Sequence, residues 1–201
     1  MLILASDGLT GESTKAALRP LTANMHRAAL VVTADNVYKA DNYHVPRCIA
    51  ELQNLGMTVD IFDIDDRAAE QLCDFDAVEF IGGNPYYLLD SIRRNNAANV
   101  LNKIAAEKLL IGWSAAAFVF GPTLALVDRC TPEMNTFGIT DLNALHLTET
   151  EVLPHYSKFI KRINTLEQIC RSYEAERNTK IIRLNDGESL FINGSNQTLC
   201  R

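Results

Sequence analysis

Ser114 is the residue whose surroundings point most directly to chemistry. The stretch from residue 111 to residue 117 reads IGWSAAA; it follows an apolar segment and opens a run of small residues. A serine on a sharp turn between a buried strand and a helix projects its hydroxyl above the edge of a sheet. The next backbone N–H, that of Ala115, and the positive helix N-terminus can then stabilise an oxyanion. The pattern predicts a nucleophilic serine, although a serine that only caps a helix fits the same residues.

A pair of glycines marks a second turn of this kind. Residues 80–84 read FIGGN and follow another apolar run. Glycine allows the backbone to approach a ligand closely, so the amide of Gly83 is a candidate second donor to an oxyanion. An ordinary strand-to-helix turn explains the same residues. Both turns are expected at the carboxyl ends of parallel strands, where such folds bind ligands, and this favours the functional interpretation.

His155 is the candidate general base. It follows the short apolar run of residues 152–153 and precedes a helical stretch. An imidazole titrates near neutrality and can take a proton from a hydroxyl. His26, His44 and His146 are less suitable, because they precede or open early segments or lie in a polar stretch.

These residues depend on elements that alternate along the chain. Apolar runs predict strands at residues 2–5, 28–33, 58–64, 77–81 and 109–112. Between them, apolar spacing of three and four residues predicts helices near 13–24, 43–55, 85–94 and 98–108. The alternation predicts an α/β fold with a mostly parallel sheet covered by helices on both faces. No linker or repeat interrupts the chain, so residues 1–201 are expected to form a single domain.

The last third of the chain has a different pattern. A long helix is expected at about 156–176, followed by strands at 180–184 and 189–193. Asp186-Gly187 between these strands is typical of a hairpin turn.

Composition excludes several functions. The net charge of −6 and the lack of a basic cluster argue against nucleic acid or an anionic membrane as a partner. The five cysteines form no CxxC pair, no His/Asp/Glu cluster has metal-ligand spacing, and no GxGxxG follows the first strand. We therefore expect no metal and no cofactor. The opening residues read as a first strand, not as a signal peptide, so a cytoplasmic location is expected.

Three segments, in this order, resemble the peptidase E (aspartyl dipeptidase) family, relatives of cyanophycinase: FIGGNPYYLLDSIR, KIAAEKLLIGWSAAA and LPHYSKF. Residues 2–10 and 31–64 are also similar to the N-terminal half of that family. The resemblance implies a three-layer sandwich of the flavodoxin-like or class I glutamine amidotransferase-like type. It further implies a cytoplasmic serine hydrolase that acts on small peptides and forms a homodimer.

The resemblance also assigns roles to residues of this chain. It makes Ser114 the nucleophile, His155 the general base, and the amides of Ala115 and Gly83 the oxyanion donors. Leu184-Asn185-Asp186-Gly187 is similar to the Leu-Pro-Glu-Gly segment of the family, which makes Asp186 the expected acid of a catalytic triad. Asp128 lies near another acidic position of the family and is the alternative acid. The remaining residues that match the two motifs are expected to bind substrate: Gly82, Asn84 and Trp113.

Two departures from the family bear on activity. Ala116 stands where the family has glycine, and the glycine turn has two glycines instead of three. An alanine forced into positive φ would strain the turn by about 1 kcal/mol.

The expected function is therefore a serine peptidase of the dipeptidase type that cleaves small peptides with an N-terminal aspartate. A cation near the serine would recognise such a residue, and the candidates are Lys158, Lys161 and Arg162, which surface charge on a helix explains equally well. Two other functions remain open. One is a peptidase-like binding protein that has lost turnover through Ala116. The other is an amidotransferase-like protein or another amide or ester hydrolase on the same scaffold.

Overall fold

A seven-stranded sheet forms the centre of the computed structural model, which describes all residues from 1 to 201. The strand order is β3-β2-β4-β5-β1-β8-β9. The first five strands in this order are parallel, β8 is antiparallel to β1, and β9 is antiparallel to β8. The mostly parallel α/β sheet predicted from the sequence is confirmed. The strands are β1 (Leu2–Ala5), β2 (Arg27–Val31), β3 (Thr58–Phe62), β4 (Ala77–Phe80), β5 (Leu109–Trp113), β8 (Ser189–Asn193) and β9 (Asn196–Cys200).

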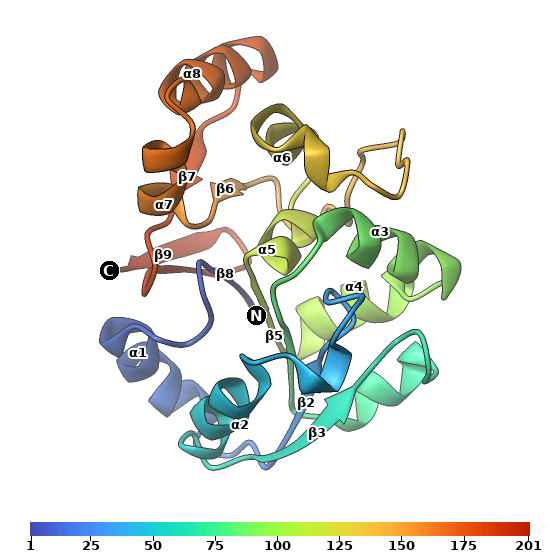
Figure 1. Cartoon of the computed structure of the whole chain (residues 1–201). Coiled ribbons are helices and arrows are strands. Elements are labelled where there is room, and N and C mark those ends of the chain that lie inside the picture. The colour runs from blue at the N-terminus through green and yellow to red at the C-terminus, as the bar shows by residue number, and fades with distance from the viewer.

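Helices cover both faces of this sheet (Figure 1). On one face lie α1 (Glu12–Thr22) and α2 (Val45–Gln53); on the other lie α3 (Pro85–Arg94), α4 (Ala98–Glu107) and α5 (Ala115–Phe120). Side chains of a strand alternate between faces, so each strand contributes to two apolar cores. In β1, Leu2 and Leu4 pack with α3, α4 and α5, whereas Ile3 and Ala5 pack with α1 and α2.

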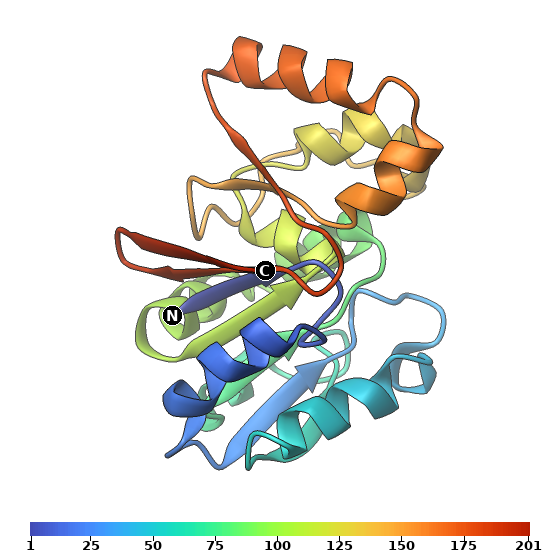
Figure 2. The same cartoon turned by 90° about the vertical axis from the view of Figure 1, so that its left-hand side faces the viewer.

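A group of short elements extends from one side of the sheet. It contains α6 (Ala125–Cys130), β6 (Glu151–Leu153), α7 (Tyr156–Arg162), α8 (Leu166–Arg177) and β7 (Ile181–Arg183). Strands β6 and β7 form a separate parallel pair. Figures 1 and 2 show this group stacked beyond α5, and its apolar side chains continue the core on that face of the sheet. Short 3₁₀ turns complete the chain at Lys39–Asp41, Ala69–Asp74 and Pro132–Met134.

Two predictions for the C-terminal third are wrong. The helix expected at 156–176 is two helices separated at residues 163–165, where Asn164 and Thr165 favour helix ends over helix interiors. Asp186-Gly187 is not a hairpin turn, because β7 pairs with β6 while β8 pairs with β1. The hairpin of this region joins β8 to β9, a strand that the sequence analysis did not predict. No helix is long and apolar enough to cross a membrane.

Candidate active site

Ser114 lies at the junction of β5 and α5, with φ 53° and ψ −112°. A residue other than glycine rarely adopts this conformation, which costs about 1–3 kcal/mol and is typical of functional sites. The serine N–H donates to the Ala5 carbonyl at 3.2 Å, which fixes the turn against β1. Gly112 makes the turn sterically feasible, because a Cβ there would lie 2.4 Å from the ring of Phe120.

Ala116 does not strain this turn. It lies inside α5, is fully buried, and is not among the residues with positive φ. The strain expected from an alanine in place of the family glycine is therefore absent. The strained backbone belongs to Ser114 itself, one residue before the helix.

His155 and Asp186 form a hydrogen-bonded pair. The imidazole Nδ1 lies 2.6 Å from Asp186 Oδ1. His155 sits between β6 and α7 in a left-handed conformation, with φ 55° and ψ 29°. Its backbone N–H donates to Ser6 Oγ at 2.8 Å, and the Ser6 hydroxyl donates in turn to Asp186 Oδ1 at 2.9 Å. Ser6 therefore holds both members of the pair.

The carboxylate of Asp186 has a second neighbour, which is a cation. Lys158 Nζ lies 2.6 Å from Asp186 Oδ2. Burial raises the pKa of Asp186, but the hydrogen bonds from Lys158, His155 and Ser6 outweigh it and hold that pKa below its usual range. Asp186 is therefore an anion at neutral pH, as an acid that orients an imidazole must be.

The loop that carries Asp186 is fixed to the beginning of the chain. Gly187 N donates to Asp7 Oδ1 at 2.8 Å, and Thr14 Oγ1 donates to the Gly187 carbonyl at 3.4 Å. Asp128, the alternative acid, lies elsewhere and accepts a hydrogen bond from Tyr86 Oη at 2.9 Å. The structure thus brings Asp186 to His155 and leaves Asp128 in another network.

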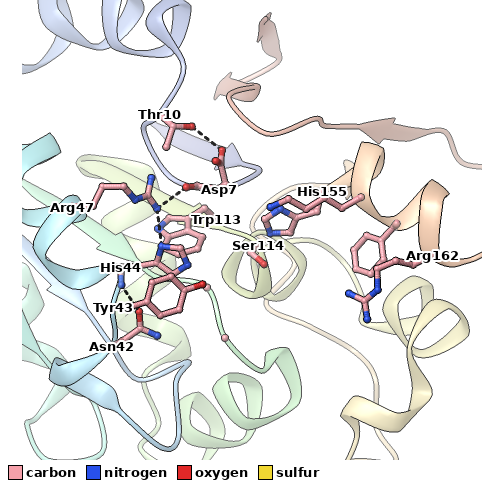
Figure 3. A pocket seen from close by; sticks show the side chains of 14 residues that line it. Asp7, Thr10, Asn42, Tyr43, His44, Arg47, Trp113, Ser114, His155 and Arg162 are labelled. Carbon is pink, nitrogen blue, oxygen red and sulfur yellow. Dashed lines mark hydrogen bonds between the residues drawn. The ribbon is translucent and has the colours of Figure 1, made fainter.

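Ser114 and His155 open into one cavity with a volume of about 690 Å³ (Figure 3). It lies at the carboxyl ends of β1, β4 and β5, where parallel sheets bind ligands. The volume is within the range of about 300–1,000 Å³ typical of small-molecule sites. The other lining residues are Asp7, Thr10, Asn42, Tyr43, His44, Arg47, Gly82, Gly83, Trp113, Lys158, Phe159 and Arg162.

The glycine turn behaves only partly as predicted. Gly82 and Gly83 line the cavity, and a Cβ on Gly83 would lie 2.2 Å from the Ala34 carbonyl oxygen. Asn84 does not line it. Its Oδ1 caps α3 by accepting from Tyr86 N at 2.9 Å, and its Nδ2 donates to Met134 O at 2.8 Å. The expected substrate-binding role of Asn84 is thus not supported, because helix capping and loop attachment occupy its polar atoms.

Several cavity residues were missed from the sequence, above all Asp7, His44 and Arg47. Asp7 lies two residues after the end of β1, and His44 directly precedes α2, so each lies at the edge of the sheet where strands end. Their positions near this edge of the sheet were the signal in the sequence that could have identified them as cavity residues. Burial, and then the charge of Arg47, lowers the pKa of His44, which favours a neutral ring beside the cavity.

The cations of the cavity differ in what they bind. Arg47 pairs with Glu51 at 3.0 Å and donates to the Asp7 carbonyl at 2.8 Å, while Lys158 pairs with Asp186. Arg162 lines the cavity and makes no ion pair or hydrogen bond in the structure. Lys161, next to it, is exposed and does not line the cavity.

A mostly parallel sheet with helices on both faces, a strained serine at a strand-to-helix turn and a His–Asp pair in one cavity define a protein with the site geometry of a hydrolase. The chain belongs to peptidase family S51, whose family model matches residues 1–200. Membership of this family, together with relatives named Peptidase E, assigns it a peptidase activity.

Individual relatives agree with this assignment. The chain is 31% identical over 152 residues to the uncharacterized peptidase Lmo0363 of Listeria monocytogenes, an alignment that covers 71% of each chain. It is 28% identical over 164 residues to Peptidase E of Salmonella newport, covering 78% of this chain and 69% of the relative. A crystal structure of a candidate peptidase E protein from Listeria monocytogenes EGD-e superposes with a TM-score of 0.79 at 25% identity, covering 100% of this chain and 97% of the other. Some alignments with relatives named Peptidase E span only 58% of their length.

Proposed function

We propose that this protein is a serine peptidase that cleaves short peptides with an acidic N-terminal residue through an acyl-enzyme intermediate. One observation carries the proposal. A histidine that is hydrogen bonded to a carboxylate shares a cavity with a serine held in a strained strand-to-helix turn. This is the combination of base, orienting acid and exposed hydroxyl that nucleophilic catalysis requires.

The geometry suggests how the proton moves. Because Nδ1 of His155 is bound to Asp186, Nε2 is the nitrogen left to accept the Ser114 proton. Ser114 Oγ attacks the peptide carbonyl carbon, and the imidazolium then gives its proton to the departing amine. Water, deprotonated by the same nitrogen, hydrolyses the acyl-enzyme. No hydrogen bond joins Ser114 to His155 in the structure, and such contacts commonly tighten when substrate binds.

Two backbone amides are available for the oxyanion. The N–H groups of Ala115 and Gly83 donate to no acceptor within the protein. Ala115 is the first residue of α5, where amides lack an intrahelical partner, and Gly83 lines the cavity. Free, preorganised donors of this kind stabilise the charge that develops on a tetrahedral intermediate.

The substrate class follows from the charges that line the cavity. Arg47, Lys158 and Arg162 face a single lining carboxylate, that of Asp7. Arg162 is the cation without a protein partner, and a guanidinium binds a carboxylate with two parallel hydrogen bonds. We therefore assign the acidic side chain of the substrate to Arg162. The cavity volume suits a short peptide rather than a folded protein.

A fluorophosphonate probe tests the nucleophile directly. We expect the wild-type protein to be labelled at Ser114, which mass spectrometry of its peptides can locate, and labelling to be lost in Ser114→Ala and His155→Ala. Peptides beginning with Asp, Asn and Ala then test the substrate class. A folded wild-type protein that resists the probe and hydrolyses none of these peptides would contradict the proposal and leave a binding function on the same scaffold.

A further inference from the structure

Glu79 is a carboxyl group in the interior of the protein that the proposed mechanism does not use. It lies in the central strand β4, is 0% exposed, and its strand neighbours are Leu30 on β2 and Ile111 on β5. Its Oε2 is the one buried side-chain nitrogen or oxygen atom with no hydrogen-bond partner in the structure. Its Oε1 accepts a hydrogen bond from the Trp113 indole N–H at 3.0 Å.

The titratable side chains closest to Glu79 come from helix α2. Cys48, Glu51 and Glu79 have ligand atoms within 4.8 Å of one another. Both oxygens of Glu51 are already engaged, one by Arg47 Nη1 at 3.0 Å and the other by Leu9 N at 3.2 Å. Only Glu79 Oε2 and Cys48 Sγ remain free, which is too few for a metal site. A proton on Glu79 is the simpler way to satisfy this cluster.

Electrostatics supports a neutral Glu79. Burial, and then the nearby charge of Glu51, raises the pKa of Glu79 to about 8. Burial also raises the pKa of the Cys48 thiol, so this thiol is uncharged at neutral pH. The carboxyl group of Glu79 is thus protonated at neutral pH and ionises as the pH rises through about 8.

Trp113 connects this carboxyl group to the cavity. It directly precedes Ser114 and forms part of the cavity wall. Its ring lies so close to Gly82 that a Cβ on that glycine would be 2.6 Å from Trp113 Cζ3. His44 meets the ring edge-to-face at 5.3 Å, and the Arg47 guanidinium lies over it at 5.6 Å. Figure 3 shows these side chains grouped on one side of Ser114, with His155 on the other.

We propose that Glu79, in its uncharged form, is a positioning residue that holds the Trp113 indole and thereby sets the cavity wall beside Ser114. The neutral carboxyl group accepts from the indole N–H without placing an unpaired charge inside the sheet. When the pH rises and the proton leaves, the buried anion faces Glu51 with no cation of its own. The indole and the wall then shift away from their neutral-pH arrangement.

Trp113 is the single tryptophan of the chain, so its fluorescence tests the inference without any assay of activity. We expect the emission of selectively excited wild-type protein to change in one step near pH 8 between about pH 6 and pH 9.5. In Glu79→Gln the step should disappear, because the amide can still accept from the indole and cannot ionise. His44 also contacts the ring, but its pKa is lowered from the ordinary value of an imidazole, so it titrates on the acid side of the expected step. A flat wild-type curve, or an unchanged step in Glu79→Gln, would overturn the inference.

Kinetics on an Asp-initiated peptide supplies a second readout that rests on the proposed function. Loss of the indole acceptor in Glu79→Leu and loss of the indole donor in Trp113→Phe should each raise KM about threefold to tenfold. Because both remove the same hydrogen bond, the double variant should be no worse than the poorer single variant. In the wild-type protein, KM should rise as the pH increases through about 8, because Glu79 then ionises. Glu79→Gln should keep the wild-type KM at neutral pH and lack this rise. Additive effects would contradict the inference, whereas a fluorescence step without any peptidase activity would reject only the proposed function.

Discussion

Ser6 links the histidine and the acid of the candidate triad. Its hydroxyl accepts from the His155 backbone and donates to Asp186, so a residue next to β1 determines where the imidazole and its acid meet. The carboxylate also binds Lys158, which keeps it ionised. The acid is therefore specified by three contacts, none of which is local in sequence to residue 186.

Replacing the acid should separate the two candidate carboxylates. Asp186→Asn preserves shape but removes the charge that favours the required imidazole tautomer, so we expect the rate of fluorophosphonate labelling to fall about 10²- to 10⁴-fold. The matched control is Asp128→Asn, since Asp128 contacts Tyr86 and not His155. Labelling time courses measure both. Equal losses in the two variants would contradict the assignment of Asp186.

The residues found from the sequence were those with a local signal. Ser114 and the glycine turn each follow an apolar strand directly, and His155 opens a helix. Asp186 was reached only through its resemblance to a family segment, because a carboxylate after a strand has no pattern of its own. Asp7, His44 and Arg47 enter the cavity through the arrangement of β1, α2 and β5, which local periodicity does not encode.

At the scale of elements, the junction of β5 and α5 positions the proposed nucleophile. Three features act together there: the close contact of Gly112 with Phe120, the strained Ser114 and the buried small residues of α5. Ala116 sits in regular helix, so its methyl group packs without distorting the turn. The junction therefore does not need glycine at residue 116.

The variant Ala116→Gly should accordingly destabilise the protein and leave its chemistry unchanged. Glycine in a helix costs about 1 kcal/mol relative to alanine, and a buried methyl group contributes about 0.8 kcal/mol more. We expect a loss of about 1–2 kcal/mol in the free energy of unfolding, measured with denaturant, at an unchanged labelling rate. Ala117→Gly is the matched control in the same buried helix. A labelling rate that rises tenfold in Ala116→Gly alone would show that the methyl group impairs the site.

Elements with strong local patterns were predicted well, and those defined by distant partners were not. The five parallel strands and the helices between them follow from continuous apolar runs and helical spacing, and the structure contains each of them within a few residues. Strand β9 alternates weakly and is mostly exposed, so its sequence resembles a loop. The β6–β7 pair consists of three-residue strands that exist only because the chain brings them together.

On the scale of the whole molecule, the lining of the cavity is richer in cations than the protein, although Glu51 and Asp186 pair with two of them, Arg47 and Lys158. The net charge is −6, yet three cations and one carboxylate line the cavity. Under the proposed function, the net charge of the protein repels an acidic peptide, and Arg162, the lining cation without a partner, attracts it. Such a local electrostatic field favours acidic ligands at the cavity, and salt weakens it by screening the charges.

Arg162→Ala should reduce the preference for peptides that begin with an acidic residue. Removing a charge-assisted contact worth about 1.5–3 kcal/mol should lower kcat/KM for Asp-initiated peptides about 10- to 100-fold and change that for Ala-initiated peptides little. Lys161→Ala, one residue away and outside the cavity, is the matched control. Steady-state kinetics at low and high salt should show the Asp preference shrinking with ionic strength in the wild-type protein. A preference that survives Arg162→Ala would assign acidic recognition to another residue.

The attachment of the Asp186 loop to residues 6–14 also determines when the site can exist. The contacts from Ser6 to Asp186, from Asp7 to Gly187 and from Thr14 to Gly187 span 173 to 180 residues of chain. During translation, His155 is synthesised before its acid partner, Asp186. The chain therefore lacks the partner that orients the proposed base until Asp186 has been made, after the five parallel strands and just before β8. The proposed hydrolytic activity therefore requires nearly the whole chain to be synthesised and the Asp186 loop to meet residues 6–14.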